Sequence, residues 1–424
     1  MFPPIDFNKT KSIFRKSLSL VPLIVLAFSA AVFADTGGPD APSPFQAQYD
    51  EIFNVMSDKF YDRSRIENEL PALFEKYRQR ASSAGSENEF SEVVNAMLQE
   101  LHVSHTYYLT PGDVEYYWLG ELFSRFLPDV KKVFNDQEVK YPSIGIITDE
   151  IENRTFVMSV FPGGPADRAG MLAGDEIVAV NGERYSPVDS LRNHVGSELK
   201  LTVKHAENEK TTVTVTPVLV NPAEEMLNAQ RNSVRIIESR GKKIGYIHIY
   251  SYAGKQYHEQ LVDSVAWGEL RGGDALIIDL RYGLGGADTS YLDIFNRNVP
   301  VITCRDNDGN VTTIDSKWRK PAVYLVNSAT RSGKELLAYG AKMFNLATVV
   351  GERTAGAVMG GQIQALANGN LLYVACRVSL SDEKELEGRG VEPDVVVPMD
   401  VRYSRGNDIQ IDEAVKYLVS ELDK

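Results

Sequence analysis

The sequence predicts a multidomain α/β protein with an N-terminal helical bundle and, in its C-terminal half, a core with a mostly parallel sheet. Three changes of pattern along the 424 residues support this prediction. Apolar residues recur at helical spacing across residues 45–120, and short alternating strands follow across 141–220. Strands then alternate with helices across 228–405, as in a parallel sheet covered by helices, and a last helix covers 406–424.

Within the first region we expect three helices, the last of which follows the serine-rich stretch 81–85 and begins at Ser86 or Asn88. In the second region the apolar alternation predicts a set of short strands. The elements expected in the third region cover residues 243–250, 257–267, 275–279, 289–296, 299–304, 323–326, 335–344 and 348–350.

The first 34 residues have the pattern of a cleavable secretory signal peptide. Basic residues precede an apolar run at 18–33, which ends in the small-residue pattern Val32-Phe33-Ala34. Serine and proline interrupt the run, and it is short for a membrane span, so an uncleaved anchor is the weaker alternative. We expect cleavage after Ala34, a secreted or periplasmic protein, and no stable membrane span afterwards.

The charge of the chain argues against several classes of partner. The formal net charge is −13, and residues 1–34 hold four basic groups and one acid, so the remainder carries −13 − 3 = −16. Such a charge disfavours nucleic acid or an anionic lipid surface as the main partner. The two cysteines, Cys304 and Cys376, lie 72 residues apart, which matches neither a metal site nor a redox motif. Whether they pair is left open, and we expect no metal.

The strand-rich region contains a specific motif at residues 162–182, PGGPADRAGMLAGDEIVAVNG. This segment closely resembles a PDZ domain, with its small-residue turn, short helix and Val-Asn-Gly hairpin. The resemblance implies a groove that binds a peptide as an added strand, with backbone amides near Ser143, Ile144, Gly145 and Ile146 holding its terminal carboxylate. A PDZ fold used only as a rigid spacer or lid is the alternative.

A serine lies at the junction between an expected strand and an expected helix. Ser332 stands in the segment 327–335, NSATRSGKE. A hydroxyl at such a junction is exposed, and the first N–H groups of the helix point at developing negative charge, as a nucleophile requires. A serine nucleophile also needs a base.

Glycines follow directly after the expected strand 275–279, in the segment 280–286, LRYGLGG. They let backbone N–H groups approach a ligand closely, so an oxyanion hole is one use. A nucleotide-binding loop is a weaker interpretation because the third glycine of that motif is missing. The third interpretation is a tight turn without a function.

The order of these segments along the chain is informative. The four segments are 279–286 (DLRYGLGG), Ser332 with Glu335, 349–356 (VVGERTAG) and 388–394 (GRGVEPD). Together they resemble the C-terminal-processing and tricorn-core clan of serine peptidases, over most of residues 240–400. The resemblance implies a ClpP/crotonase-like core, polypeptide substrates, Ser332 as nucleophile, and an oxyanion hole formed by the N–H groups of Gly285 and Gly333.

The base of the processing branch is missing from its place. In that branch a lysine stands 25 residues after the serine, and here the position is Ala357. Lys334 and Lys342 lie on the nucleophile's own helix and are expected to be solvated surface groups.

Histidine is the usual general base, and the chain has six. We expect surface or polar-side positions for His194, His205, His248 and His258. The segment 100–107, ELHVSHTY, is similar to the tricorn-core motif in which a Ser-His pair supplies the base, which implies roles for Ser104 and His105 but not His102. In tricorn-type enzymes a glutamate orients the histidine, and Glu387 stands at the matching place; a solvated loop carboxylate is its alternative.

We therefore expect a serine peptidase that cleaves unfolded or C-terminally presented polypeptides. His105 would take the proton of Ser332, Glu387 would orient His105, and Ser104 would bond to the carboxylate or the ring, with no metal or organic cofactor. One alternative is a catalytically inactive peptide- or ligand-binding protein that retains the fold. Another is a Ser-Lys peptidase with a displaced lysine, Lys334 or Lys342.

Overall fold

The computed structural model describes residues 44–381 and 384–424. The expected signal peptide lies outside these residues. Within the described part, no helix combines the length and the apolar character that a membrane crossing needs.

The N-terminal part is helical, with one more helix than the sequence pattern predicts. Its long helices bury residues at helical spacing such as Tyr49, Ile52 and Met56. As expected, Ser86 is an N-cap: its hydroxyl accepts the N–H of Glu89 at 3.2 Å. The helices are α1 (Pro44–Lys59), α2 (Arg63–Asn68), α3 (Leu70–Ser82) and α4 (Glu87–Gln99).

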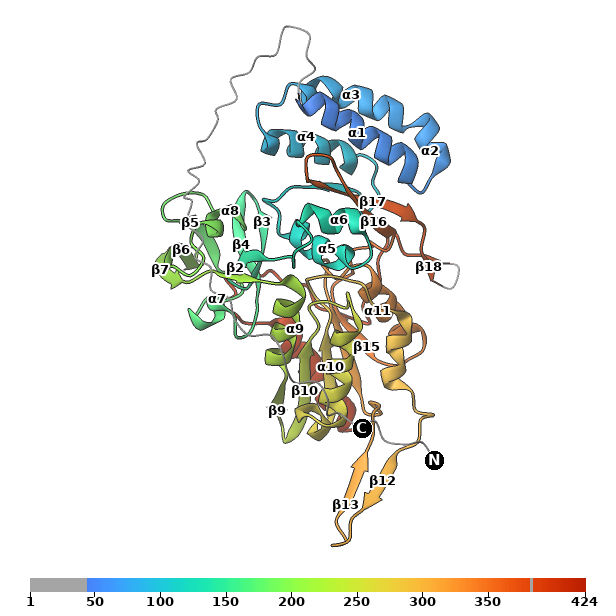
Figure 1. The fold of residues 1–424 in the computed structure, drawn as a ribbon. Coiled ribbons are helices and arrows are strands. Elements are labelled where there is room, and N and C mark those ends of the chain that lie inside the picture. Colours follow the sequence, from blue (N-terminus) through green and yellow to red (C-terminus); the bar gives the residue numbers. More distant parts are fainter. Residues whose placement is uncertain (1–43, 382–383) are drawn as a thin grey trace, which may run out of the picture. The chain divides into compact units, whose positions relative to one another are not determined.

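These helices share their apolar core with a small sheet from the distant part of the chain (Figure 1). The sheet has the order β1-β17-β16 and comprises β1 (Tyr107–Leu109), β16 (Gly360–Ala365) and β17 (Leu371–Arg377). Strand β1 pairs antiparallel with β17, with Tyr107 opposite Tyr373. The segment just before β1 is thereby fixed against the C-terminal third of the chain.

Two helices and a short strand pair lead into the next region: α5 (Val114–Ser124), α6 (Pro128–Val133), β2 (Tyr141–Ser143) and β8 (Val218–Val220). Between β2 and β8 lies a five-stranded antiparallel sheet around the buried residues Val157 and Leu201. Its elements are β3 (Ile146–Ile151), β4 (Arg154–Val160), α7 (Pro165–Arg168), β5 (Glu176–Val180), α8 (Asp189–Arg192), β6 (Leu199–Ala206) and β7 (Glu209–Val215).

A six-stranded sheet of order β20-β15-β14-β11-β10-β9 forms the core of the C-terminal half. Neighbouring strands from β10 to β20 run parallel, and β9 is antiparallel to β10. The strands are β9 (Arg235–Ser239), β10 (Lys242–His248), β11 (Ala275–Asp279), β14 (Ala322–Val326), β15 (Thr348–Gly351) and β20 (Val395–Val396).

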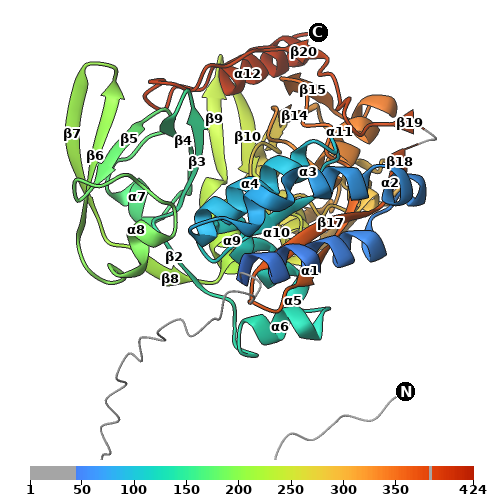
Figure 2. The ribbon, with the colours of Figure 1, turned by 90° about the horizontal axis from the view of Figure 1, so that it is seen from above.

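Helices cover this sheet, and β11 and β14 are buried along their whole length. One face packs against α12, with Leu418 among Ile277 and Val323. Figure 2 shows α12 beside the strands of the sheet, and α9 and α10 apart from α12. The helices are α9 (Pro222–Ser233), α10 (Lys255–Ala266), α11 (Gly333–Met343) and α12 (Ile409–Leu422).

Two expected elements of this region differ in the structure. Residues 299–304 were predicted as a sheet strand, but β12 (Ile302–Arg305) pairs only with β13 (Val311–Ile314) in an exposed hairpin that projects from the core (Figure 1). Threonine and valine favour strands in a hairpin as much as in a sheet, so the pattern cannot separate them. Residues 289–295 form the 3₁₀ helix η2 (Thr289–Phe295). Short elements complete the chain: η1 (Glu269–Gly272), β18 (Leu380–Ser381) and β19 (Lys384–Glu385).

Candidate active site

Ser332 occupies a strained turn between β14 and α11. Its backbone has φ 58° and ψ −135°, which side-chain-bearing residues rarely adopt. Strained residues of this kind cluster at functional sites, where the surrounding structure holds them. The N–H of Ser332 donates to the carbonyl of Ala357 at 2.8 Å, so the segment that lacks the family lysine contacts the serine directly.

Glu335, in the first turn of α11, holds that segment in place. Its carboxylate is fully buried and accepts hydrogen bonds from the Thr354 hydroxyl at 2.5 Å, from the N–H groups of Gly356 and Ala357 at 2.7 and 2.8 Å, and from Ser332 N–H at 3.2 Å. Burial raises the pKa of Glu335, and these bonds oppose the rise. The spacing Ser-x-x-Glu at a helix start accounts for the contact of Glu335 with the Ser332 N–H but not for its contacts with residues 354–357.

Glycines are required where the loop after β11 meets the serine. A Cβ at Gly285 would lie 2.5 Å from the Cβ of Ser332, and one at Gly333 would lie 2.3 Å from the backbone nitrogen of Ala287. Both distances are too short for any side chain. The loop 280–286 and the start of α11 therefore meet backbone to backbone, beside the Ser332 hydroxyl.

Glu387, Ser104 and His105 form a hydrogen-bonded chain, although Ser104 and Glu387 are 283 residues apart in sequence. The Ser104 hydroxyl lies 3.0 Å from Glu387 Oε2 and 2.9 Å from His105 Nδ1. Glu387 also accepts the N–H groups of Ser104 at 2.8 Å, Val358 at 2.8 Å and Met359 at 3.1 Å. We expect from the sequence that Ser104 bonds to the carboxylate or to the ring, and in the structure it contacts both and stands between them.

This chain fixes the tautomer of His105. A hydroxyl has one proton, and Ser104 donates it to the Glu387 carboxylate, which can only accept. Ser104 must then accept the proton of His105 Nδ1–H, which leaves Nε2 unprotonated as the basic nitrogen. His105 is half-buried, and burial lowers its pKa to about 4, with the charge of Arg331 acting in the same direction.

Residues that flank Ser332 border the same cleft as His105. A cavity of 570 Å³ is lined by residues that include Ser104, His105, Arg331 and Ala357. Arg331 precedes Ser332, and Ala357 accepts its N–H, so both flank the nucleophile. Across residues 44–381 and 384–424, no hydrogen bond joins the Ser332 hydroxyl to the His105 ring. Catalytic hydrogen bonds often form only when substrate is bound.

The expectation that Lys334 is a solvated surface group was wrong. Lys334 is fully buried, and its amine donates to the carbonyl of Tyr282 at 2.6 Å. Burial lowers its pKa to about 7. Lys334 lies in the first turn of α11, and its side chain points toward the glycine-rich loop 280–286 rather than toward solvent. The charge pattern of the sequence alone does not reveal this direction. Lys342 is partly exposed and pairs with Asp394 at 3.0 Å.

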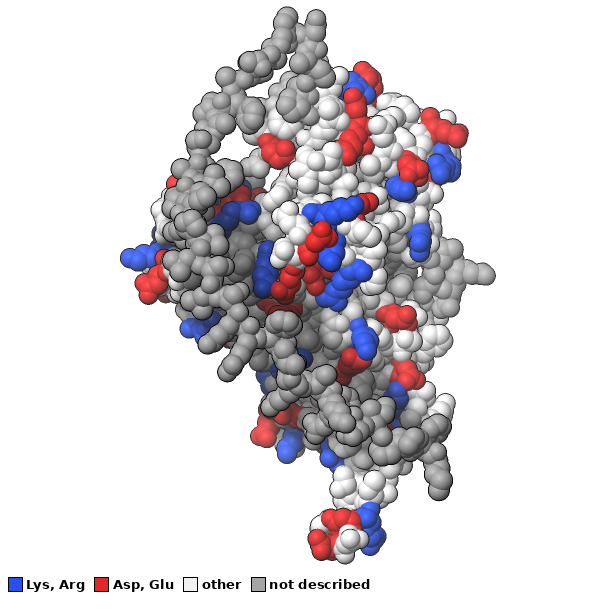
Figure 3. All heavy atoms as spheres, viewed as in Figure 1, with Lys and Arg blue, Asp and Glu red and all other residues white. Residues whose placement is uncertain are grey.

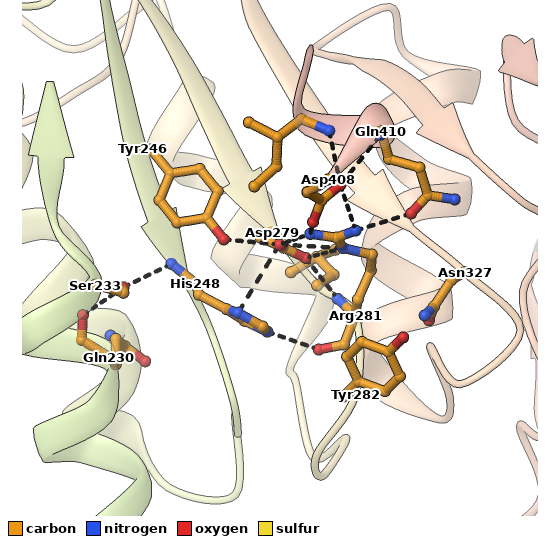
Figure 4. A network of polar contacts seen from close by, with 12 residues as sticks. Gln230, Ser233, Tyr246, His248, Asp279, Arg281, Tyr282, Asn327, Asp408 and Gln410 are labelled. Atoms are coloured by element: carbon orange, nitrogen blue, oxygen red, sulfur yellow. Dashed lines mark hydrogen bonds and ion pairs between the residues drawn. The ribbon is translucent and has the colours of Figure 1, made fainter. Parts of the chain in front are cut away.

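A buried polar network includes Arg281 of the loop 280–286 (Figure 4). Arg281 pairs with Asp279, at the end of β11, at 2.6 Å and with Asp408, the N-cap of α12, at 2.7 Å. Burial alone would raise the pKa of Asp279, but the Arg281 guanidinium holds it well below its usual range. His248 Nε2 contacts the Arg281 carbonyl at 2.8 Å.

His248 faces a polar network, as expected, and His248 and His258 are both more buried than solvated surface groups. His248 is buried and stacks on Tyr250 with ring centroids 3.8 Å apart, and burial lowers its pKa to about 4. His258 was expected to be solvated, but it is half-buried and stacks on Tyr291 at 4.1 Å. Both rings pack against a neighbouring tyrosine, which no spacing rule predicts.

The expected peptide groove lies between β3 and α8 as a cavity of 370 Å³. Ser143, Ile144 and Ile146 line it, but the Gly145 N–H is already bonded to the Ser143 hydroxyl at 2.9 Å. That hydroxyl in turn donates to Glu225 at 2.6 Å. A carboxylate bound here must compete with Ser143 for the Gly145 amide.

Among the residues that the structure describes, no cluster of histidine, cysteine and carboxylate side chains has the composition of a metal site. Cys304 and Cys376 are both free thiols. Figure 3 shows acidic and basic side chains interspersed on the face it presents.

The family models that match this chain describe a peptidase and a PDZ domain. The chain contains a tricorn protease C1 domain at residues 43–99, a PDZ domain at 156–204 and a peptidase family S41 domain at 243–397.

Individual relatives match over much of the chain. The Arabidopsis thaliana carboxyl-terminal-processing peptidases 3 and 2, both chloroplastic, are 26% and 31% identical over 302 and 270 residues, covering 65% and 57% of this chain. The chain spans only 58% and 49% of those relatives' own length. The putative tricorn protease homolog 2 of Streptomyces coelicolor is 24% identical over 91% of this chain and 33% of that protein.

The fold is shared with a solved structure. The crystal structure of the tricorn protease matches 90% of this chain and 37% of its own with a TM-score of 0.55, at 18% sequence identity.

Proposed function

We propose that the chain is a serine peptidase that cleaves unfolded or C-terminally presented polypeptides, with Ser332 as nucleophile and His105 as general base. The observation that carries this proposal is the hydrogen-bonded chain Glu387–Ser104–His105, since its members Ser104 and His105 line the same cleft as residues that flank Ser332. The core is then of the ClpP/crotonase-like kind, and no metal or organic cofactor takes part.

In the proposed mechanism, Nε2 of His105 removes the Ser332 proton as Oγ attacks the scissile carbonyl carbon. The N–H groups of Gly285 and Gly333 bind the resulting oxyanion. The imidazolium keeps its Nδ1–H on the Ser104 oxygen, which the Glu387 carboxylate polarises. His105 then protonates the leaving amine, and water hydrolyses the acyl enzyme by the same steps.

Acyl labelling tests the base without knowledge of the natural substrate. A fluorophosphonate should label the full chain at Ser332, and His105→Ala should abolish labelling. His102→Ala is the matched control, because His102 lines the same cleft but lies outside the hydrogen-bonded chain. Labelling that survives in His105→Ala would exclude His105 as the base.

Lys334 supports a second candidate, a Ser-Lys peptidase. It lies two residues after Ser332, is fully buried, and has a pKa near neutrality. A lysine of this kind is able to act as a base. Labelling would then be lost in Lys334→Met and kept in His105→Ala, the reverse of the pattern above.

The third possibility is an inactive binding protein, which Ala357 in the place of the family lysine favours. It predicts no labelling of Ser332 and no cleavage of an unfolded polypeptide such as reduced casein. Either reaction, if it depends on Ser332, contradicts it.

We further propose that the groove between β3 and α8 binds a free peptide carboxyl terminus, whose carboxylate replaces the Ser143 hydroxyl on the Gly145 amide. A peptide library with free termini should bind more tightly than its amidated counterpart in fluorescence anisotropy. Equal binding of the two would favour the spacer or lid interpretation.

Finally, we propose that residues 1–34 direct export to a secreted or periplasmic location. The exported protein should begin at Asp35 on N-terminal sequencing. An intact N-terminus on membrane-bound protein would instead identify an anchor.

A further inference from the structure

An ion pair lies directly beside the nucleophile and joins two distant parts of the chain. Arg331, the residue before Ser332, pairs through Nη2 with Oε1 of Glu115, in the first turn of α5. The two side chains are 25% and 30% exposed, so the pair is largely withdrawn from water. An ion pair at this depth is screened less than a surface pair and acts more strongly on nearby charges.

The pair is anchored at both ends. Arg331 is fixed by the Ser332 turn, and its Nε lies 3.4 Å from the carbonyl of Gly283 in the glycine loop. The start of α5, which carries Glu115, is fixed because the Asp113 carboxylate, just before α5, accepts the Thr110 N–H at 2.7 Å. Between Thr110 and His105 runs β1, which is paired with β17. The pair therefore connects the turn that carries the serine with the segment that carries the histidine.

The position of the pair within the cavities is also unusual. Arg331 and Glu115 both line the 570 Å³ cleft beside His105 and a second cleft of 470 Å³ next to Tyr282 and Ala355. Glu115 additionally lines the groove between β3 and α8. The pair thus forms part of the wall where these three cavities meet.

We propose that Arg331 and Glu115 are a positioning pair for His105: they hold the serine turn against the histidine segment and keep their combined charge at the base close to zero. This inference rests on the proposed role of His105 as general base. Neither residue transfers a proton; both act through His105.

The charges around His105 give the proposal its direction. Burial lowers the pKa of His105 most, Arg331 lowers it further, and Glu115 raises it. The other polar groups on the packed elements are Tyr107 of β1, Tyr373 of β17, 5.1 Å from the His105 ring, and Glu387, which reaches the ring through Ser104. Arg331 and Glu115 are the two charged groups that shift the pKa of His105 in opposite directions.

Removing one charge of the pair should therefore shift the titration midpoint of His105 in a defined direction. Glu115→Gln leaves Arg331 uncompensated and should lower this midpoint. Arg331→Met leaves Glu115 uncompensated and should raise the midpoint by about one pH unit or more. The conservative variants Arg331→Lys and Glu115→Asp keep the charges and should leave the midpoint nearly unchanged.

The experiment is an NMR titration of the histidine ring carbons in the full chain, with the His105 signal assigned by its loss in His105→Ala. It measures the histidine whether or not the protein is active. Opposite shifts in the two neutral variants, with recovery in the conservative ones, support the proposal. Shifts in the same direction, or none, in variants with a native circular dichroism spectrum contradict it.

Fluorophosphonate labelling of the same variants separates this inference from the proposed function. If wild-type Ser332 is not labelled, the peptidase proposal fails while the titration still decides the charge balance. If the wild type is labelled, Arg331→Met and Glu115→Gln should each slow labelling at least about tenfold, because the serine turn and the base are no longer held in the geometry that the reaction needs. Unchanged rates with unchanged midpoints would overturn the positioning role. Should the neutral variants not fold, the titration of Arg331→Lys and Glu115→Asp decides: a midpoint that departs by more than about one pH unit contradicts the proposal.

Discussion

At the scale of single residues, the most informative side chain is Ser104, because it stands between a carboxylate and an imidazole. It has two neighbours within 3.0 Å, Glu387 and His105, and one proton to give. The imidazole orientation therefore depends on a hydroxyl that is held in turn by Glu387. Loss of that hydroxyl leaves the ring with no partner at Nδ1 that fixes its tautomer.

Ser104→Ala is expected to slow the labelling of Ser332 by about a hundredfold, since a base without its orienting partner loses much of its efficiency. Ser104→Thr keeps the hydroxyl and should retain most of the rate. The double variant Ser104→Ala/Glu387→Gln should be little worse than Ser104→Ala, because both act through one bond path. Additive losses in the labelling kinetics would show that Glu387 acts independently of Ser104.

Lys334 makes a second prediction at this scale, which concerns stability. Its pKa is lowered from 10.5 to about 7 in the folded chain. Between pH 10.5 and 7 the unfolded chain therefore takes up a proton that the folded chain does not, so stability falls as the pH falls through this window. Lys334→Met should remove this dependence.

The check is urea unfolding at pH 7 and pH 9.5. The stability gain on going to the higher pH should be roughly 3 kcal/mol in the wild type and largely absent in Lys334→Met. Lys342→Met, which alters a partly exposed lysine of the same helix, is the control and should behave like the wild type. A pH dependence that persists without Lys334 would assign it to another group.

At the scale of elements, two strands of the C-terminal half have different surroundings. Strand β11 is buried at every residue, whereas β12 is exposed at every residue. Burial of side chains, and not strand formation, supplies most of the stabilisation. The hairpin β12–β13 therefore contributes little to the fold that supports the site.

A matched pair of substitutions tests this difference. Ile278→Ala, in β11 at 0% exposure, should cost about 2–5 kcal/mol, and Ile302→Ala, in β12 at 56% exposure, should change stability by less than about 0.5 kcal/mol. Both are isoleucines in strands, so strand propensity cancels. A large loss in Ile302→Ala, measured by urea unfolding, would mean that the hairpin is covered in solution.

The elements also show how much of the fold can be predicted from the sequence. The junction at Ser332 could be predicted because a fully apolar strand and an amphipathic helix flank it, and the cap at Ser86 because its local pattern is complete within four residues. The hairpin at 302–314 could not, because β propensity does not report what a strand pairs with.

The site divides in the same way. His105, Ser104 and Glu387 were selected by resemblance to a known motif, and no local pattern joins residues 283 positions apart. The burial of Lys334 and the pairing of Arg331 with Glu115 were missed, because both depend on which side chains the tertiary fold brings together.

At the scale of the whole molecule, the network around Arg281 joins the sheet, the glycine loop and the last helix (Figure 4). Arg281 is 5% exposed and bonds to Asp279, Asp408 and Gln410. Its removal would leave the fully buried Asp279 without its cation.

Arg281→Met should therefore destabilise the chain by about 3–5 kcal/mol. Arg402→Met removes an arginine of the same paired type, but its partner Asp400 is exposed, so the cost should stay below about 1 kcal/mol. Thermal unfolding of the two variants against the wild type measures both. Equal losses would show that the buried network contributes no more than a surface pair.

The 283-residue separation of Ser104 and Glu387 has a consequence for biosynthesis. On the proposed assignment, the ribosome adds His105 long before it adds the carboxylate of Glu387, which holds Ser104. A chain still being synthesised contains Ser332 before it contains Glu387, so the carboxylate that holds Ser104 is absent until Glu387 has been added. On the proposed assignment, the order of the residues along the chain therefore delays proteolytic activity until Glu387 has been synthesised and has folded against Ser104.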